Sequence, residues 1–245
     1  MTHDPATRPR PPRAYLVLKW VLGPVVRVMT RREWSGGERL PHGGFIAVAN
    51  HLSDADPFTF GLFLVDHGIY PRILAKDSLF RVPVVGRVLR SAGIIPVERG
   101  RASAAASLEE ARAALAAGEC VAIYPEGTHT FDPDLWPMTA KTGAARLALT
   151  TRAPVVPVAQ WGPQEFRPPH SRRINVRALP FPARVRAGGP VDLSDLYDDA
   201  PSPSAGAVAA ATGRIMAALT AEVAILRGME PPAQPYDRSR GPAGP

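Results

Sequence analysis

The sequence has very little cysteine and lysine. Cys120 is the only cysteine among 245 residues, which excludes an intrachain disulfide and a cysteine-based zinc cluster. It opens an apolar run at residues 120–124, so we expect a small core residue rather than a catalytic thiol. Lys19, Lys76 and Lys141 are the only lysines among 29 basic residues. In so arginine-rich a chain, Lys76 and Lys141 hint at positions where a compact ammonium group is preferred.

The N-terminal apolar stretch, residues 14–29, falls short of a membrane span. A span needs about 20 mainly apolar residues, and a lysine, an arginine and a Gly-Pro pair interrupt this stretch. No small-residue cleavage site follows, so we do not expect a signal peptide. Residues 1–32 hold seven basic residues and one acid. With Tyr15 and Trp20, this pattern is typical of a helix lying on an anionic bilayer. A helix packed on the domain with solvated arginines is the alternative.

The overall composition is that of an ordinary globular protein, with 45% apolar and 21% charged residues. The formal charge of +7 favours an anionic partner. Nucleic acid is not expected, because the positive charge is concentrated near the N-terminus and aromatic residues are not interleaved with it. No spacing typical of metal ligands is present.

Strand-like and helix-like segments alternate through the middle of the chain. This pattern predicts an α/β fold with a mostly parallel central sheet flanked by helices. The expected strands are residues 45–48, 72–75, 94–97, 120–124 and 153–158, and the helices are 57–67, 84–91, 103–117 and 141–151. After residue 160 we expect two strands, 172–179 and 183–187, and a long helix, 205–227.

We divide the chain into three regions. Residues 1–35 are predicted to be a disordered arm and a basic, apolar membrane-interface helix. Residues 36–227 form one α/β domain, because neither an internal repeat nor a second hydrophobic core is visible in the sequence. Residues 228–245 contain five prolines and three glycines and are predicted to be a flexible tail.

A histidine and a carboxylate follow the first predicted strand. His51 stands where that strand ends, and Asp56 stands five residues later, where the next helix begins. A histidine can act as a general base near neutral pH, and a carboxylate on its second ring nitrogen fixes the tautomer. In the alternative interpretation, Asp56 is a helix N-cap before Pro57, and His51 is a surface residue.

Polar residues also follow three other predicted strands. Lys76 ends one strand, Arg99 follows another, and Glu126, Gly127 and Thr128 follow a third. Arginine presents a planar fork that suits phosphate, and glycine lets a ligand approach the backbone. These strand ends therefore combine acid–base groups with groups suited to phosphate.

Four short blocks of the sequence belong together: residues 50–56 (NHLSDAD), 93–99 (GIIPVER), 124–128 (YPEGT) and 155–158 (VVPV). The first is similar to the NHxxxxD signature of the glycerolipid acyltransferases of the lysophosphatidic acid acyltransferase type. The other three resemble later blocks of that family in the same order. In the third block His129 stands where the family commonly has arginine, so His129 or a nearby arginine would have to replace that residue.

The resemblance implies transfer of a fatty acyl group from acyl-CoA or acyl carrier protein to the free hydroxyl of 1-acyl-glycerol-3-phosphate. It implies a catalytic pair, His51 and Asp56, with no cofactor and no metal. The acceptor phosphate or polar head would be held by Arg99, Glu126, Gly127, Thr128 and Lys76.

The resemblance also implies a location in the cell, and it leaves alternative functions open. We expect a peripheral or monotopic protein on the cytoplasmic face of an anionic membrane. The same chemistry on glycerol-3-phosphate or another lysophospholipid is an alternative. A non-catalytic lipid-binding protein at the membrane surface is a rival from another class, and the intact His51/Asp56 pair argues against it.

Overall fold

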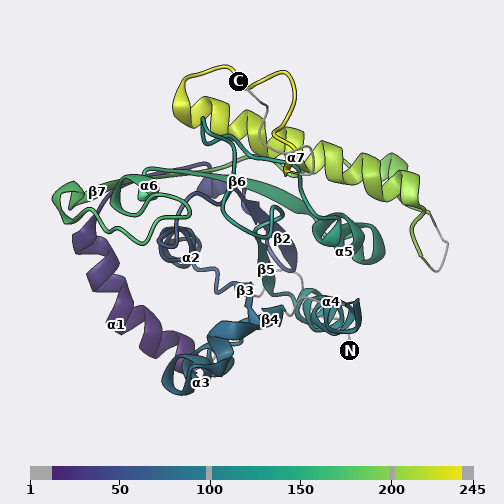
Figure 1. The fold of residues 1–245 in the computed structure, drawn as a ribbon. Helices are drawn as coiled ribbons and strands as arrows, with labels where there is room; N and C mark the ends of the chain where they lie inside the picture. The colour runs from purple at the N-terminus through teal and green to yellow at the C-terminus, as the bar shows by residue number, and fades with distance from the viewer. Residues whose placement is uncertain (1–12, 98–100, 199–201, 239–245) are drawn as a thin grey trace.

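A seven-stranded sheet with helices on both faces organises the molecule (Figure 1). The computed structural model describes residues 13–97, 101–198 and 202–238. The strand order is β1-β7-β6-β2-β5-β3-β4. All neighbouring strands are parallel except β6 and β7, which are antiparallel. The predicted α/β fold with a mostly parallel sheet is therefore confirmed.

The elements follow one another in an almost regular alternation. The strands are β1 (Thr30–Ser35), β2 (Phe45–Ala49), β3 (Arg72–Lys76), β4 (Ile95–Val97), β5 (Cys120–Ile123), β6 (Val155–Trp161) and β7 (Phe181–Ala187). The α-helices are α1 (Arg13–Met29), α2 (Asp56–Asp66), α3 (Pro83–Ser91), α4 (Arg101–Ala116), α5 (Gly143–Thr151), α6 (Pro163–Phe166) and α7 (Ala205–Arg227). Short 3-10 turns occupy Gly37–Arg39, Asp77–Arg81, Val176–Ala178 and Ser194–Leu196.

The buried strand β2 separates two hydrophobic layers. Side chains alternate across a strand, so Phe45 and Ala47 pack with Phe60 and Phe63 of α2 on one face. On the other face, Ile46 belongs to a cluster formed with α4, α5 and α7. Because both faces are covered, β2 is apolar at every position, as expected for a parallel strand inside an α/β sheet.

Helix α7 is a core helix of the sheet's second face. Its 23 residues are long and apolar enough to cross a membrane by length and composition alone. Its buried side chains, however, recur along one stripe that packs against the sheet: Val208, Ala211, Ile215, Leu219 and Val223. Ser204 caps the start of the helix with a hydroxyl that accepts the amide of Ala207, and Gly228, with φ +62°, caps its end.

The predicted strand at residues 172–179 is wrong. Ile174 and Val176 alternate as they would in a strand, but both are exposed, and the segment is a loop followed by a 3-10 turn. The sheet instead gains β1, where Thr30 pairs with Phe181 of β7. β1 falls within residues 1–35, so the sheet includes part of the region we assigned to the N-terminal arm.

The first part of the predicted flexible tail lies against the domain. The amide of Thr139 donates to the carbonyl of Tyr236 at 3.0 Å. The guanidinium of Arg238 lies 4.3 Å from the ring centre of Phe131. Residues 1–12 of the predicted disordered arm and 239–245 of the tail lie outside the described residues.

Candidate active site

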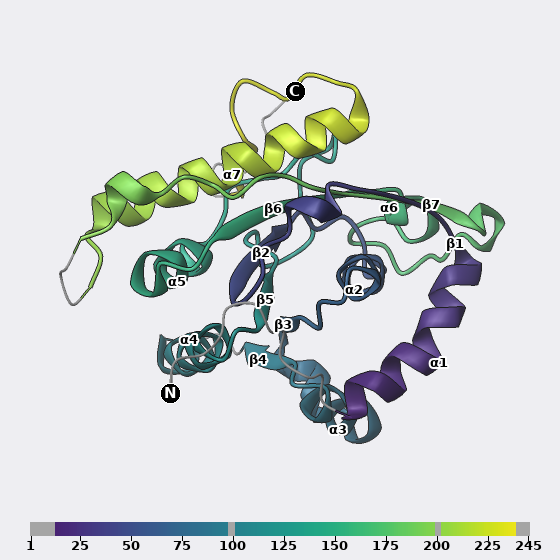
Figure 2. The same cartoon turned by 180° about the vertical axis from the view of Figure 1, so that it is seen from behind.

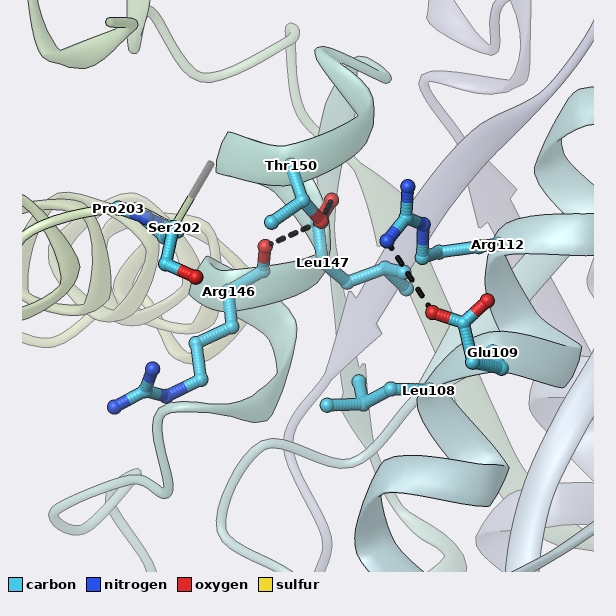
Figure 3. A pocket seen from close by; sticks show the side chains of 8 residues that line it. All are labelled: Leu108, Glu109, Arg112, Arg146, Leu147, Thr150, Ser202 and Pro203. Carbon is cyan, nitrogen blue, oxygen red and sulfur yellow. Dashed lines mark hydrogen bonds and ion pairs between the residues drawn. The ribbon is translucent and has the colours of Figure 1, made fainter. Parts of the chain in front are cut away.

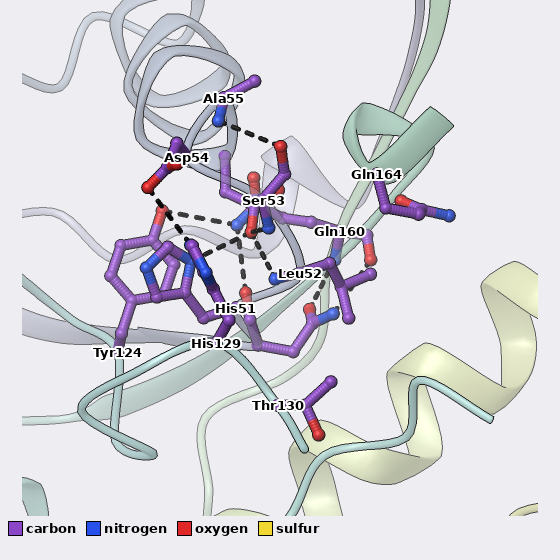
Figure 4. A network of polar contacts seen from close by, with 12 residues as sticks. His51, Leu52, Ser53, Asp54, Ala55, Tyr124, His129, Thr130, Gln160 and Gln164 are labelled. Carbon is purple, nitrogen blue, oxygen red and sulfur yellow. Dashed lines mark hydrogen bonds and ion pairs between the residues drawn. The ribbon is translucent and has the colours of Figure 1, made fainter. Parts of the chain in front are cut away.

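The loops after β2 and β5 meet at the carboxyl edge of the parallel strands (Figure 4). His51 follows β2, and the segment from Tyr124 to Thr130 follows β5. The amide of Thr130 donates to the carbonyl of His51 at 2.9 Å, which fixes one loop against the other. Two of the sequence blocks, distant along the chain, thus form one site.

His51 and Asp56 are in direct contact. The distance from His51 Nδ1 to Asp56 Oδ2 is 3.0 Å. Asp56 is fully buried, whereas the His51 side chain keeps 17% of its surface exposed. A carboxylate only accepts hydrogen bonds, so Nδ1 carries the hydrogen and Nε2 is left as the acceptor. This is the tautomer that a general base requires.

The Asp56 carboxylate does not cap its own helix. Its Oδ2 also accepts the backbone amides of Leu52 and Ser53, the latter at 2.8 Å, both of which precede α2. The amides of Phe58 and Thr59, which an N-cap side chain would accept, donate to the carbonyl of Ala55 instead. The side chain is therefore turned toward the histidine loop, and the N-cap interpretation fails. Its Oδ1 is buried without a partner.

Glu126 supports the same loop from β5. Its Oε1 accepts the amide of His51 at 3.2 Å, and its Oε2 accepts the amide of Met138 at 3.0 Å. Burial raises the pKa of Glu126 to about 8. The side chain is only 3% exposed, so the contacts seen here position the backbone of His51.

Two aromatic rings enclose the imidazole of His51. Tyr124 stacks on it with ring centres 4.2 Å apart, and His129 meets it edge-on at the same distance. Burial, and next the proximity of His51, lower the pKa of His129 to about 4. His129 is thus neutral near pH 7 and does not supply the charge of the arginine it replaces.

An arginine from another segment lies beside His129. Arg167, which follows α6, pairs with Asp54 through Nε at 2.7 Å. The other oxygen of Asp54 is 3.5 Å from His129 Nε2. A guanidinium therefore stands near the position of the missing motif arginine, and only the folded structure reveals it.

Asn50 and Gln160 join the ends of β2 and β6. Asn50 Oδ1 accepts the amide of Gln160 at 2.8 Å, and Asn50 Nδ2 donates to the carbonyl of Gln160 at 3.0 Å. Gln160 also accepts the hydroxyl of Thr59 in α2 at 3.0 Å. Sequence reasoning missed Gln160, because its role depends on a contact between residues 110 positions apart.

The remaining predicted binding residues are arranged less tightly. Gly127 adopts φ +70°, and a Cβ there would lie 3.0 Å from Lys141 Nζ, so an ammonium group flanks this turn. Thr128 follows and is half-buried. Lys76 ends β3 with its side chain exposed. Arg99 lies outside the described residues. The predicted binding roles of these residues, and that of Glu126, remain predictions.

The pocket in Figure 3 lies apart from this site. It lies between α4, α5 and the segment that leads into α7, and none of its lining residues belongs to the loops after β2 or β5. Within the described residues, no group of His, Cys, Asp or Glu could hold a metal ion. Burial raises the pKa of Cys120 far above its usual value, which fits the expected inert core thiol.

Comparisons with known proteins agree with this arrangement. The sequence model of the Acyltransferase family matches residues 31–161. The 1-acyl-sn-glycerol-3-phosphate acyltransferase of Borreliella burgdorferi is 32% identical over 134 residues, which cover 54% of this chain and 52% of the relative. The enzyme of that name from Bacillus subtilis is 32% identical over 127 residues, 51% of this chain and 60% of the relative. The chain thus spans about half the length of these curated relatives.

The fold also resembles a solved structure. The 1-acyl-sn-glycerophosphate (LPA) acyltransferase PlsC from Thermotoga maritima superposes with a TM-score of 0.63. The alignment covers 90% of this chain and 88% of the other, at 20% sequence identity, so it shows the shared fold. Because the family match extends over more than half of the sequence and includes His51, Asp56 and Glu126, this chain belongs to the Acyltransferase family.

Proposed function

We propose that the protein is an O-acyltransferase that moves a fatty acyl group from acyl-CoA or acyl carrier protein to the free hydroxyl of 1-acyl-glycerol-3-phosphate, giving phosphatidic acid. The observation that carries the proposal is the contact between His51 Nδ1 and the buried carboxylate of Asp56. The relatives named for this reaction support the choice of acceptor.

The chemistry follows from the tautomer of His51. Its Nε2 removes the proton of the acceptor hydroxyl while that oxygen attacks the thioester carbonyl carbon. The tetrahedral intermediate collapses to the ester, the carbon–sulfur bond breaks, and the thiolate takes the proton from His51. Asp56 stabilises the transient imidazolium, as the aspartate does in serine proteases. No acyl-enzyme is needed, because the acceptor itself is the nucleophile.

The acceptor phosphate is proposed to lie across the strand ends next to His51. Arg99, Lys76 and the turn at Gly127 and Thr128 would bind it, with Lys141 flanking the turn. Glu126 would act on the acceptor through the histidine loop that it holds. A positioned general base accelerates the reaction by a factor of about 10²–10⁴. The remaining rate acceleration comes from fixing the acceptor and the thioester together.

The enzyme is proposed to work on the cytoplasmic face of an anionic membrane. Helix α1 packs on the domain through the buried ring of Tyr15, which meets Tyr70 edge-on at 5.5 Å. Several of its other apolar side chains are exposed, among them Trp20 at 76% and Val28 at 80%. A basic helix with such an exposed apolar face is suited to the interface of a bilayer.

A panel of acceptors tests the proposal. The purified protein would be given one acyl-CoA with lysophosphatidic acid, other lysophospholipids or glycerol-3-phosphate, and products would be separated by mass. We expect phosphatidic acid to form fastest. A faster reaction with glycerol-3-phosphate or another lysolipid would support acyl transfer but would show that the proposed acceptor is wrong. Absence of acceptor-dependent thiol release with every compound would favour the non-catalytic lipid-binding alternative.

A further inference from the structure

The loop between α6 and β7, residues 167–180, has an unusual composition. It contains four arginines and neither aspartate nor glutamate. Three of the arginines, Arg172, Arg173 and Arg177, are exposed, and no described residue forms an ion pair with them. Between them stand Ile174 and Val176, which are 52% and 66% exposed. Cationic and aliphatic side chains are thus presented to solvent together.

The fold holds this loop in one shape. The amide of Asn175 donates to the carbonyl of Phe166 at 2.8 Å, which closes the segment between these two residues. At its tip, His170 stacks on Phe131 with ring centres 4.0 Å apart, and its Nε2 is 2.9 Å from the carbonyl of Thr130. The exposed aliphatic side chains therefore belong to a tethered surface.

The loop lies at the same edge of the sheet as the active site. β6 is antiparallel to β7, so β7 begins where the catalytic strands end. β1 is parallel to β7 and pairs Thr30 with Phe181, so the C-terminal end of α1 arrives at this edge too. Figures 1 and 2 show the start of β7 beside that end of α1. Phe58 of α2, two residues after Asp56, is 50% exposed.

We infer that residues 167–180 form a second membrane contact, which together with α1 holds the active-site edge against an anionic lipid surface. Arginines alone would suit any acidic partner, including a carrier protein. The aliphatic residues between them, and the position of the loop's end beside the C-terminal end of α1, match the mixed charged and apolar boundary of a bilayer. The inference rests on the proposed function only in that the site works at a lipid surface.

Paired substitutions in the full-length protein test whether the loop arginines contribute to membrane binding. Each arginine near an anionic bilayer strengthens binding by about fivefold. Arg172→Gln with Arg173→Gln should therefore weaken binding to equimolar phosphatidylglycerol–phosphatidylcholine vesicles about 30-fold in low salt. The matched control, Arg112→Gln with Arg146→Gln, removes two exposed arginines from α4 and α5 and should change binding less than twofold. Equal binding by the loop variant and the control would overturn the inference.

A fluorophore attached to the loop tests whether the loop enters the bilayer. Cys120 is the only native cysteine and is buried, so Val176→Cys can be labelled selectively with an environment-sensitive fluorophore. We expect its emission to shift to the blue on vesicles and to be quenched by spin-labelled lipid. The same label at Thr150→Cys, on α5, should not respond. A Val176 label that remains in water on saturating vesicles would contradict the inference.

Activity separates this inference from the proposed function. With a short-chain, water-soluble acceptor and no vesicles, the arginine loop variant should match the wild type. If it instead binds vesicles normally and raises KM for acyl carrier protein but not for acyl-CoA, the surface serves an acidic protein and the membrane assignment is wrong. If the wild type transfers no acyl group, the proposed function fails, while the vesicle and label experiments still decide the inference.

Discussion

Replacing Asp56 by asparagine separates its charge from its shape. Asp56 Oδ2 receives hydrogen bonds from His51 Nδ1 and the amides of Leu52 and Ser53. An asparagine oxygen in that place can accept the same three, while its NH2 group takes the position of Oδ1, which has no partner. The loop should therefore keep its form, and the negative charge beside His51 should be lost.

The expected effects differ greatly between stability and catalysis. A buried NH2 without a partner costs about 1–3 kcal/mol, which for a chain of this size lowers Tm by several degrees. Loss of the charge that stabilises the imidazolium should reduce kcat by about two orders of magnitude or more, or about 2.7 kcal/mol in activation free energy. Thiol release from acyl-CoA in the presence of lysophosphatidic acid would measure kcat, and calorimetry would measure Tm.

A matched variant at the other end of the same helix controls the experiment. Asp66 ends α2 and binds Arg27 and Trp34 Nε1, remote from His51. With a detergent-dispersed acceptor, Asp66→Asn should change kcat by less than about twofold. An Asp56→Asn enzyme as active as Asp66→Asn would refute the orienting role of Asp56.

Three further predictions follow from the site and its surroundings. Burial raises the pKa of Glu126 from its ordinary value of 4.5 to about 8 in the folded state, so this group makes the unfolding free energy fall as pH rises between those values. Glu126→Gln should reduce this fall of the unfolding free energy with pH, as measured by urea titrations at several pH values across that range. An unchanged pH dependence of the unfolding free energy would contradict the prediction. Arg99→Ala should raise the acceptor KM and lower kcat while the donor KM changes little; equal damage to both substrates would assign Arg99 to CoA or to the fold. Trp20→Ser with Val28→Ser should weaken co-sedimentation with anionic vesicles without lowering Tm, since both side chains are exposed, and full co-sedimentation would contradict the membrane role of α1.

The sequence predicts the central strands because each is a continuous apolar run. The runs of β2, β5 and β6 are buried along almost their full length. β1 was missed because it is an edge strand, in which Arg31, Arg32 and Glu33 are exposed. The alternation at residues 172–179 predicts a strand that does not form, because a period of two gives the spacing of aliphatic residues but not what covers them.

The candidate site could be predicted where its residues belong to short sequence motifs, as His51, Asp56 and Glu126 do. His51 and Asp56 are five residues apart, and this spacing is enough to predict the pair. The anchoring of Asn50 by Gln160 and the position of Arg167 beside Asp54 depend on contacts between distant segments. Periodicity carries no signal for such contacts. The neutral state of His129 likewise follows from burial, which only the fold determines.

The proposed chemistry depends most directly on His51 as the base in a transfer without an acyl-enzyme. We would compare the wild type with His51→Ala, following thiol release and phosphatidic acid together and recording the intact protein mass during turnover. We expect equal amounts of thiol and product and no acylated protein from the wild type. In a folded His51→Ala protein, the rates of thiol release and product formation should both fall by about two orders of magnitude or more. Acceptor-dependent thiol release that survives in His51→Ala, or an acylated wild-type protein that forms and decays at the rate of turnover, would contradict it.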